Sequence, residues 1–303
     1  MRRIPMSSEV FIRRHPPAVV SGQTPAAHNI LEDIVWHKAG EIAAWRLAEP
    51  YEAIDARARH ASPARDFVGA LAAAAKKTGR PGLIAEIKKS SPSRGILQPN
   101  FDPVRIARGY EAGGAACLSI LTDERYFGGC FENLSTVRGA GVSCPLLCKE
   151  FVVDEYQIAR ARAFGADAVL LIAAVLSSAE LASLTAAAHG RGMAALLEVH
   201  SAEEAARVAA LPEVCLNPAR TLVGVNARDL TTFKVDLGIL ERVAASPAGH
   251  ALLHRNVCLV GESGIFTPED VKRVQQARFG AMLVGESVVK QGDTEAAVRQ
   301  LLA

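Results

Sequence analysis

The sequence feature that most constrains the fold is a regular alternation of short apolar runs with amphipathic segments, from residue 83 to the C-terminus. The apolar runs cover residues 83–87, 117–121, 145–148, 168–172, 195–199, 222–225, 258–260 and 281–284. Strands that are apolar on both faces and separated by single helices are typical of a parallel sheet. Eight such units in succession favour a closed barrel over an open sheet.

This succession predicts the α/β fold class, a (β/α)8 TIM barrel with an N-terminal helical extension. No Gly-x-Gly-x-x-Gly turn follows the first strand, as it often does in doubly wound sheets. One helix is expected after each strand, beginning near Asp102, Phe131, Asp154, Ser177, Ser201, Asp236, Thr267 and Asp293. Asn29 and Glu32 are spaced as an N-cap and its capping-box partner, and residues 66–77 indicate an alanine-rich helix. We therefore expect residues 29–303 to form one barrel domain, with residues 29–80 as a helical segment packed against it.

The first 28 residues are rich in arginine and proline and lack the apolar core of a secretory signal. We interpret them as a flexible N-terminal extension, and both a transit-peptide remnant and a bacterial extension fit their composition. The whole chain has 34 basic and 32 acidic side chains, and its formal charge of +2 is too small for a nucleic-acid or membrane footprint. No apolar run approaches the ~20 residues of a membrane span. The six cysteines have no metal-binding spacing and are expected to be buried free thiols.

Polar residues gather at the carboxyl ends of the predicted strands, where barrels of this class hold their chemistry. Glu86 and Lys88 lie two residues apart, so their side chains share one face of the first strand, and we expect that face to be the barrel interior. Lys149, Glu198 and Glu262 end other strands. Inward charges are costly unless paired, so we expect these lysines and acids to meet across one pocket as general acid and base. Other polar residues at strand ends are Ser91, Arg94, Thr122, Asp123, Glu150, His200, Asn226, Arg228, Asp229 and Ser287.

Two similar turns, at residues 261–264 and 284–287, end the last two predicted strands. Barrels commonly hold a phosphate there, on backbone N–H groups that glycine leaves accessible. One such turn fits an ordinary tight turn, whereas two copies on consecutive strands favour a phosphate cradle. The expected ligand is a small phosphorylated molecule.

With these residues in place, the chain resembles the indole-3-glycerol phosphate synthases. Residues 83–95, LIAEIKKSSPSRG, are similar to the family's Glu-x-Lys-x-x-Ser-Pro-Ser signature on its first barrel strand. Residues 118–129, 147–158, 196–200, 223–230 and 261–265 resemble further family stretches in the same order. The resemblance covers the chain from residue 29 to its end.

The resemblance implies the substrate 1-(2-carboxyphenylamino)-1-deoxyribulose 5-phosphate, which undergoes ring closure, loss of CO₂ and loss of water without a cofactor or metal. Lys149 matches the general acid that protonates the ketone oxygen, and Lys88 matches a lysine that assists proton transfer. Glu198 matches a carboxylate that stabilises the developing cation, while Glu86 and Asn226 match the pair that orients a sugar hydroxyl and assists dehydration. The matched substrate contacts are Arg228 and Glu262 in the polar lining, Ser91, Ser263, Gly264, Gly285 and Glu286 at the phosphate, and Phe151 and Leu170 as apolar walls.

Two positions depart from the family pattern, Cys130 after Phe-Gly-Gly and Ala227 between Asn226 and Arg228, and neither removes a charged group. Residues 13–17 and 30–38 resemble photosynthetic-bacterial and plastid members, which implies a cytoplasmic protein or, as the alternative, one of the plastid stroma. We expect a monomer or weak homodimer that binds a small sugar phosphate, with no nucleic-acid or membrane partner.

Two other functions share this fold. Phosphoribosylanthranilate isomerase, another phosphate-binding barrel of the same pathway, needs a Cys/Asp acid–base pair rather than a set of lysines and glutamates. A catalytically silent barrel could bind a sugar phosphate as a sensor or assembly subunit. Such a protein has no chemical need for all five of the predicted catalytic residues.

Overall fold

The eight predicted strands form a closed parallel barrel in the computed structural model, which describes residues 27–92, 94–229, 234–289 and 292–303. The barrel strands are β1 (Gly82–Ile87), β4 (Cys117–Leu121), β5 (Leu146–Lys149), β6 (Ala168–Ile172), β7 (Ala194–Val199), β8 (Thr221–Asn226), β9 (Cys258–Glu262) and β10 (Ala281–Val284). They pair in chain order, and β10 pairs with β1 to close the ring. The predicted fold class is thus confirmed. Three predicted strands have the observed bounds, and the others differ by one or two residues at an end.

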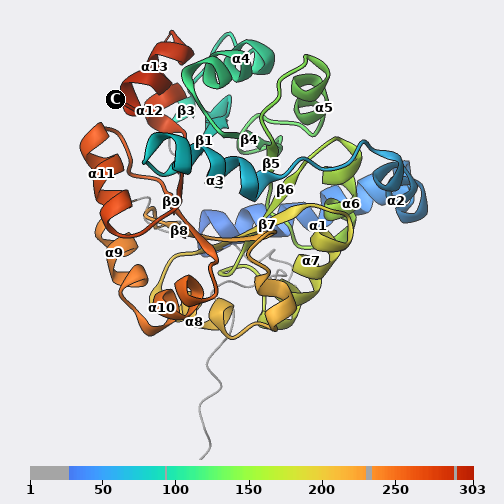
Figure 1. The fold of residues 1–303 in the computed structure, drawn as a ribbon. Helices are drawn as coiled ribbons and strands as arrows, with labels where there is room; N and C mark the ends of the chain where they lie inside the picture. The colour runs from blue at the N-terminus through green and yellow to red at the C-terminus, as the bar shows by residue number, and fades with distance from the viewer. Residues whose placement is uncertain (1–26, 93, 230–233, 290–291) are drawn as a thin grey trace, which may run out of the picture.

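Helices surround the barrel (Figure 1), and most begin at the predicted capping residues. The elements between and after the strands are α4 (Pro103–Gly113), α5 (Glu132–Gly139), α6 (Glu155–Ala163), α7 (Ser178–Gly190), α8 (Ala202–Ala209), the 3₁₀ helix η1 (Glu213–Leu216), α9 (Gly238–Ala244), α10 (Pro247–His254), α11 (Pro268–Gln276), α12 (Glu286–Val289) and α13 (Thr294–Leu301). Asp154, Ser177 and Thr267 form complete capping boxes. The prediction of one helix per strand is wrong after β8 and after β10, because each is followed by two helices among the described residues.

In the part of the chain that the structure describes, three helices precede β1: α1 (Ile30–Ala48), α2 (Tyr51–His60) and α3 (Phe67–Thr78). The Asn29 side chain accepts the N–H of Glu32 at 3.0 Å, which confirms the predicted N-cap of α1. The Glu32 carboxylate accepts the N–H of His28, one residue earlier than a capping box requires. Most of the predicted extension, residues 1–26, lies outside the described residues.

Helices α3 and α1 lie at opposite ends of the barrel (Figure 1). Helix α3 packs against the first residues of two strands, because Leu71 lies against Gly82 and the thiol of Cys117 donates to the carbonyl of Phe67. Helix α1 reaches the opposite, carboxyl end, where its Lys38 contacts acids that follow β4 and β5. These contacts place α3 and α1 against the two ends of the barrel.

Apolar side chains fill both the barrel interior and the layer between strands and helices. Every residue of β1, β4, β6, β7, β8 and β10 is buried. All six cysteines are free thiols; four are buried as predicted, whereas Cys130 and Cys258 are partly exposed. Among the described helices, none has the length and apolar character of a membrane span.

Candidate active site

A cavity opens at the carboxyl ends of the barrel strands and encloses about 860 Å³ of empty space, counting the part open to solvent. Among its lining residues are Glu86, Lys88, Ser91, Lys149, Phe151, Leu170, Glu198, Asn226, Arg228, Ser263 and Glu286. An adjoining smaller cavity shares several of them and adds Glu262, Gly264 and Gly285. The two cavities together bring every catalytic and substrate-contact residue predicted from the sequence to one end of the barrel.

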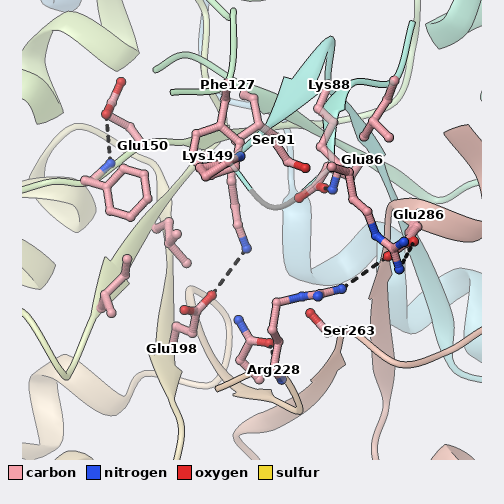
Figure 2. A pocket seen from close by; sticks show the side chains of 18 residues that line it. Glu86, Lys88, Ser91, Phe127, Lys149, Glu150, Glu198, Arg228, Ser263 and Glu286 are labelled. Carbon is pink, nitrogen blue, oxygen red and sulfur yellow. Dashed lines mark hydrogen bonds and ion pairs between the residues drawn. The ribbon is translucent and has the colours of Figure 1, made fainter. Parts of the chain in front are cut away.

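Lys149 lies at the centre of this site, as the last residue of β5. Its ammonium nitrogen is 2.9 Å from Glu262 Oε2 and 3.3 Å from Glu198 Oε2, and Figure 2 shows it reaching across the cavity toward Glu198. Burial disfavours the charge of Lys149, but the attraction of Glu262 and Glu198 outweighs burial and raises its pKa. Lys149 is therefore held as a charged donor in a largely desolvated position.

The two acids that hold Lys149 differ in their own surroundings. His200 Nε2 lies 3.2 Å from Glu198 Oε1, so Glu198 stands between two cations. Although burial opposes its ionisation, Lys149 and His200 lower the pKa of Glu198. Among the described residues, Glu262 pairs with Lys149 alone, and burial together with the charge of Glu198 raises the pKa of Glu262 to about 8. The two carboxylates thus differ, because the surroundings of Glu198 favour its ionised form and those of Glu262 disfavour it.

A missing side chain makes room for the carboxylate of Glu262 inside the barrel. A Cβ atom at Gly224, in the neighbouring strand β8, would overlap Glu262 Oε1. Gly224 therefore permits an acid to point inward at a place where strands usually carry large apolar side chains.

Glu86 and Lys88 form a second ion pair at the end of β1, with 2.5 Å between Glu86 Oε1 and Lys88 Nζ. Both line the cavity, which confirms that the alternation along this strand points them inward. Burial opposes the charge of Glu86, but Lys88 and Lys149 outweigh it and lower its pKa. The site therefore holds a second lysine and carboxylate side by side.

Apolar side chains form one wall of the cavity. Phe151 and Leu170 lie there as predicted, together with Phe127, whose ring centroid is 5.9 Å from that of Phe151. Phe127 was not predicted to line the site, although it lies within the family-like stretch at residues 118–129. The rings provide a surface on which a flat aromatic group can pack.

The opposite wall is polar and contains the two predicted phosphate turns. Ser263 and Gly264 both have positive φ, 65° and 75°, and such consecutive left-handed residues turn backbone N–H groups toward one side. Glu286 lies between Arg94 and Arg228, with N···O distances of 3.2 Å to each guanidinium, and Figure 2 shows Arg228 beside it. The wall thus combines backbone donors with two arginines.

Two further strand-end acids bind backbone groups of their own loops. Glu150 follows Lys149 directly, but its carboxylate turns away from Lys149 and accepts the N–H of Phe151 at 2.8 Å (Figure 2). Asp123 is fully buried and accepts backbone N–H groups of its own loop. In the described part of the chain, no three His, Cys, Asp or Glu side chains are grouped as metal ligands would be.

Comparisons with known proteins bear on the same residues. The family model described as "Indole-3-glycerol phosphate synthase" matches residues 31–301. The chain is 48% identical to the chloroplastic indole-3-glycerol phosphate synthase of Arabidopsis thaliana, over 98% of this chain and 75% of that protein. It is 44% identical to the indole-3-glycerol phosphate synthase of Crocosphaera subtropica, over 96% of this chain and 99% of that protein. Thiamine phosphate pyrophosphorylase from Pyrococcus furiosus resembles 73% of this chain and 93% of its own, with a TM-score of 0.51 and 18% identity, a similarity of fold alone.

Proposed function

Because the chain belongs to the indole-3-glycerol phosphate synthase family, we propose which of its residues carry out that enzyme's reaction. The protein is an indole-3-glycerol phosphate synthase, a carboxy-lyase of tryptophan biosynthesis with a sugar-phosphate substrate. The observation that supports the residue roles best is the charged Lys149 between Glu198 and Glu262, with an aromatic wall on one side and the two glycine turns on the other.

The proposed substrate, 1-(2-carboxyphenylamino)-1-deoxyribulose 5-phosphate, has groups that suit both walls. Its ring packs against Phe151 and Leu170, and its phosphate binds the turns at Ser263–Gly264 and Gly285–Glu286. This placement folds the molecule over Lys149 and brings the ring carbon near the ketone carbon. Ring closure within one molecule gains most from such orientation.

Lys149 acts first in the proposed mechanism. It donates a proton to the ketone oxygen while the ring carbon that bears the carboxylate bonds to the ketone carbon, and the developing cation on the substrate nitrogen is stabilised by Glu198. The bond to the carboxylate then breaks, CO₂ leaves, and its electron pair restores the aromatic ring.

Dehydration completes the indole. The hydroxyl formed from the ketone leaves as water with a proton from Lys88, while a proton leaves the carbon next to the nitrogen and passes to Glu198. Glu86 and Asn226 orient the hydroxyl, and Glu86 is well placed because it already contacts Lys88. Arg228, Glu262 and Ser91 complete the polar lining.

The proposal is tested by incubating purified chain with this substrate and following indole fluorescence. We expect turnover by the native chain and its loss when Lys149 or Glu198 is replaced. A folded native chain that binds the substrate and forms no indole would contradict the proposed mechanism, and it would favour a silent sugar-phosphate-binding barrel.

We further propose that residues 29–303 act as one domain, that the enzyme is a monomer or weak homodimer, and that it works in the cytoplasm, with the plastid stroma as the alternative. Relatives from cyanobacteria and a chloroplast support either location. Sedimentation equilibrium measures the oligomeric state, and a stable higher oligomer would contradict this part of the proposal.

A further inference from the structure

A lysine from the N-terminal helix is buried among acids outside the reacting groups. Lys38, on α1, has an exposed fraction of 0%. Its ammonium nitrogen is 2.7 Å from Glu41 Oε2, 2.7 Å from Asp123 Oδ2 and 2.9 Å from Glu150 Oε1. Burial disfavours the charge of Lys38, but Glu150 and Asp123 outweigh burial and raise its pKa. One cation thus joins α1 to the ends of two barrel strands.

Asp123 and Glu150 also organise the loops that carry the aromatic wall. Asp123 Oδ1 accepts the backbone N–H groups of Tyr126 at 2.7 Å and Phe127 at 3.2 Å. Glu150 Oε1 accepts the backbone N–H of Phe151 at 2.8 Å. Each acid therefore accepts the backbone N–H of one wall phenylalanine, and the charge of each acid is balanced by Lys38.

The two loops are also tied to each other. Thr122, beside Asp123, donates its hydroxyl to Glu150 Oε2 at 2.9 Å. The rings of Phe127 and Phe151 lie 5.9 Å apart with their planes inclined by 35°. Ion pairs and hydrogen bonds behind the wall thus determine how far apart the two rings stand at its surface.

We propose that Lys38 is a positioning residue for the substrate's aromatic ring: it holds Asp123 and Glu150, and these acids fix Phe127 and Phe151 as the walls of the ring site. The inference rests on the proposed function, because that function places the anthranilate-derived ring at this wall. Lys38 does not line the described cavity, so it acts through the two loops.

Removal of the Lys38 charge should affect binding more than chemistry. Without Lys38, two buried acids must take up protons or admit water, and a neutral carboxyl group is a weaker acceptor for backbone N–H groups. Lys149 keeps its own ion pairs with Glu198 and Glu262, which lie on barrel strands. We therefore expect Lys38→Met to raise KM about five- to tenfold, on the scale of a lost aromatic packing contact, with kcat changed less than about threefold.

A matched control separates this role from plain stabilisation. Asp55, on α2, is buried and pairs at 2.7 Å with Arg191, the residue that caps the end of α7. This ion pair therefore also joins the N-terminal segment to the barrel, but it involves neither loop of the aromatic wall. Asp55→Asn should lower the melting temperature without changing KM. Lys38→Arg, which keeps the charge, should recover much of the affinity that Lys38→Met loses.

The experiment measures kcat, KM and melting temperature for these variants, and the binding of anthranilate alone and of inorganic phosphate alone by calorimetry. We expect Lys38→Met to weaken anthranilate binding and leave phosphate binding unchanged. If Lys38→Met does not fold, Lys38→Met with Glu150→Gln removes both charges of one pair and should still show the raised KM. A lower melting temperature with native KM and native anthranilate affinity would overturn the proposal, whereas a native chain without turnover would overturn the proposed function instead.

Discussion

Replacing Lys149 by methionine separates a catalytic lysine from a structural one, because methionine keeps the length and apolar stem and removes the charge. Lys149 is the proton donor of the proposed mechanism. Its ammonium group also contacts Glu198 and Glu262, so it balances the charge of two buried acids. A general acid contributes about 10²–10⁴-fold to a rate, so we expect kcat to fall at least about 10²-fold. Substrate affinity should change little, because the ring and phosphate walls remain.

The stability cost follows from what the two acids can do without Lys149. Removing one partner of a buried ion pair costs about 3–5 kcal/mol when the remaining charge has no other partner. Here Glu198 retains His200, and Glu262, whose pKa burial and the charge of Glu198 already raise, becomes neutral at pH 7 once Lys149 no longer opposes its protonation. We therefore expect a smaller loss, about 1–3 kcal/mol, or about 2–4 °C of melting temperature for each kcal/mol.

The initial rate of indole formation at saturating substrate, followed by fluorescence, gives kcat, and calorimetry gives the melting temperature. The control is Lys149→Met combined with Glu262→Gln, which removes the stranded acid and should restore part of the stability while turnover stays low. A Lys149→Met variant that turns over substrate within about threefold of the native chain and melts much earlier would refute the general-acid role and leave Lys149 a structural ion-pair partner.

Three further outcomes are expected. A Cβ at Gly285 would overlap the carboxylate of Glu86 and would stand in the proposed phosphate turn. Gly285→Ala should therefore lower kcat by displacing Glu86 and raise KM by weakening phosphate binding, and an unchanged KM would place the phosphate elsewhere. Burial disfavours the charge of His200, but its acidic neighbours raise its pKa from 6.5 to about 10. Its charge therefore stabilises the native chain fully below about pH 6.5, and that stabilisation is lost as the pH rises through about 10. The difference in melting temperature between native chain and His200→Gln should shrink over this window, and a constant difference would argue against a charged His200. Deletion of residues 1–28 should leave kcat and KM unchanged, whereas deletion of residues 1–63 should raise KM, and equal kinetics for both truncations would speak against a role for the helical segment.

The barrel was predictable because its strands are buried on both faces and its helices begin at capping residues, two signals that are local in the sequence. Where local signals compete, the prediction failed. Strand β9 continues to Glu262, two residues beyond its predicted end. The strand was predicted to end early because Gly261 and Glu262 have the residue types of a turn, whereas in the structure the inward-pointing Glu262 is the last strand residue. Helix α10 was not predicted, although Ser246 caps it and Pro247 occupies its first turn, because the regular alternation predicts a single helix between two strands.

The candidate site was predictable to the extent that strand position determines direction. Glu86 lies in β1, Lys88 follows two positions later and Lys149 ends β5, so the alternation of side chains along a strand predicts that all three point inward. Phe127 was missed because it lies in a loop, where no periodicity indicates which way a side chain points. The sequence predicts that Lys149 pairs with acids. It does not predict that the pKa values of Glu198 and Glu262 are shifted in opposite directions, because this depends on the contact of His200 with Glu198 and on the space that Gly224 leaves for Glu262.

Lys149 and Glu150 show how one strand end can serve two tasks. Successive residues at a strand end point in opposite directions, so Lys149 reaches into the cavity while the Glu150 carboxylate turns to Lys38 and the N–H of Phe151. Alternation could therefore have excluded Glu150 from the chemistry, but it could not have named Lys38 as its partner, because that lysine comes from a helix before the barrel begins. Since a single peptide bond joins the proton donor to the acid that fixes the aromatic wall, the ketone and the ring of a bound substrate are both positioned relative to the end of β5. A change on the Lys149 side should therefore alter kcat, and a change on the Glu150 side should alter KM.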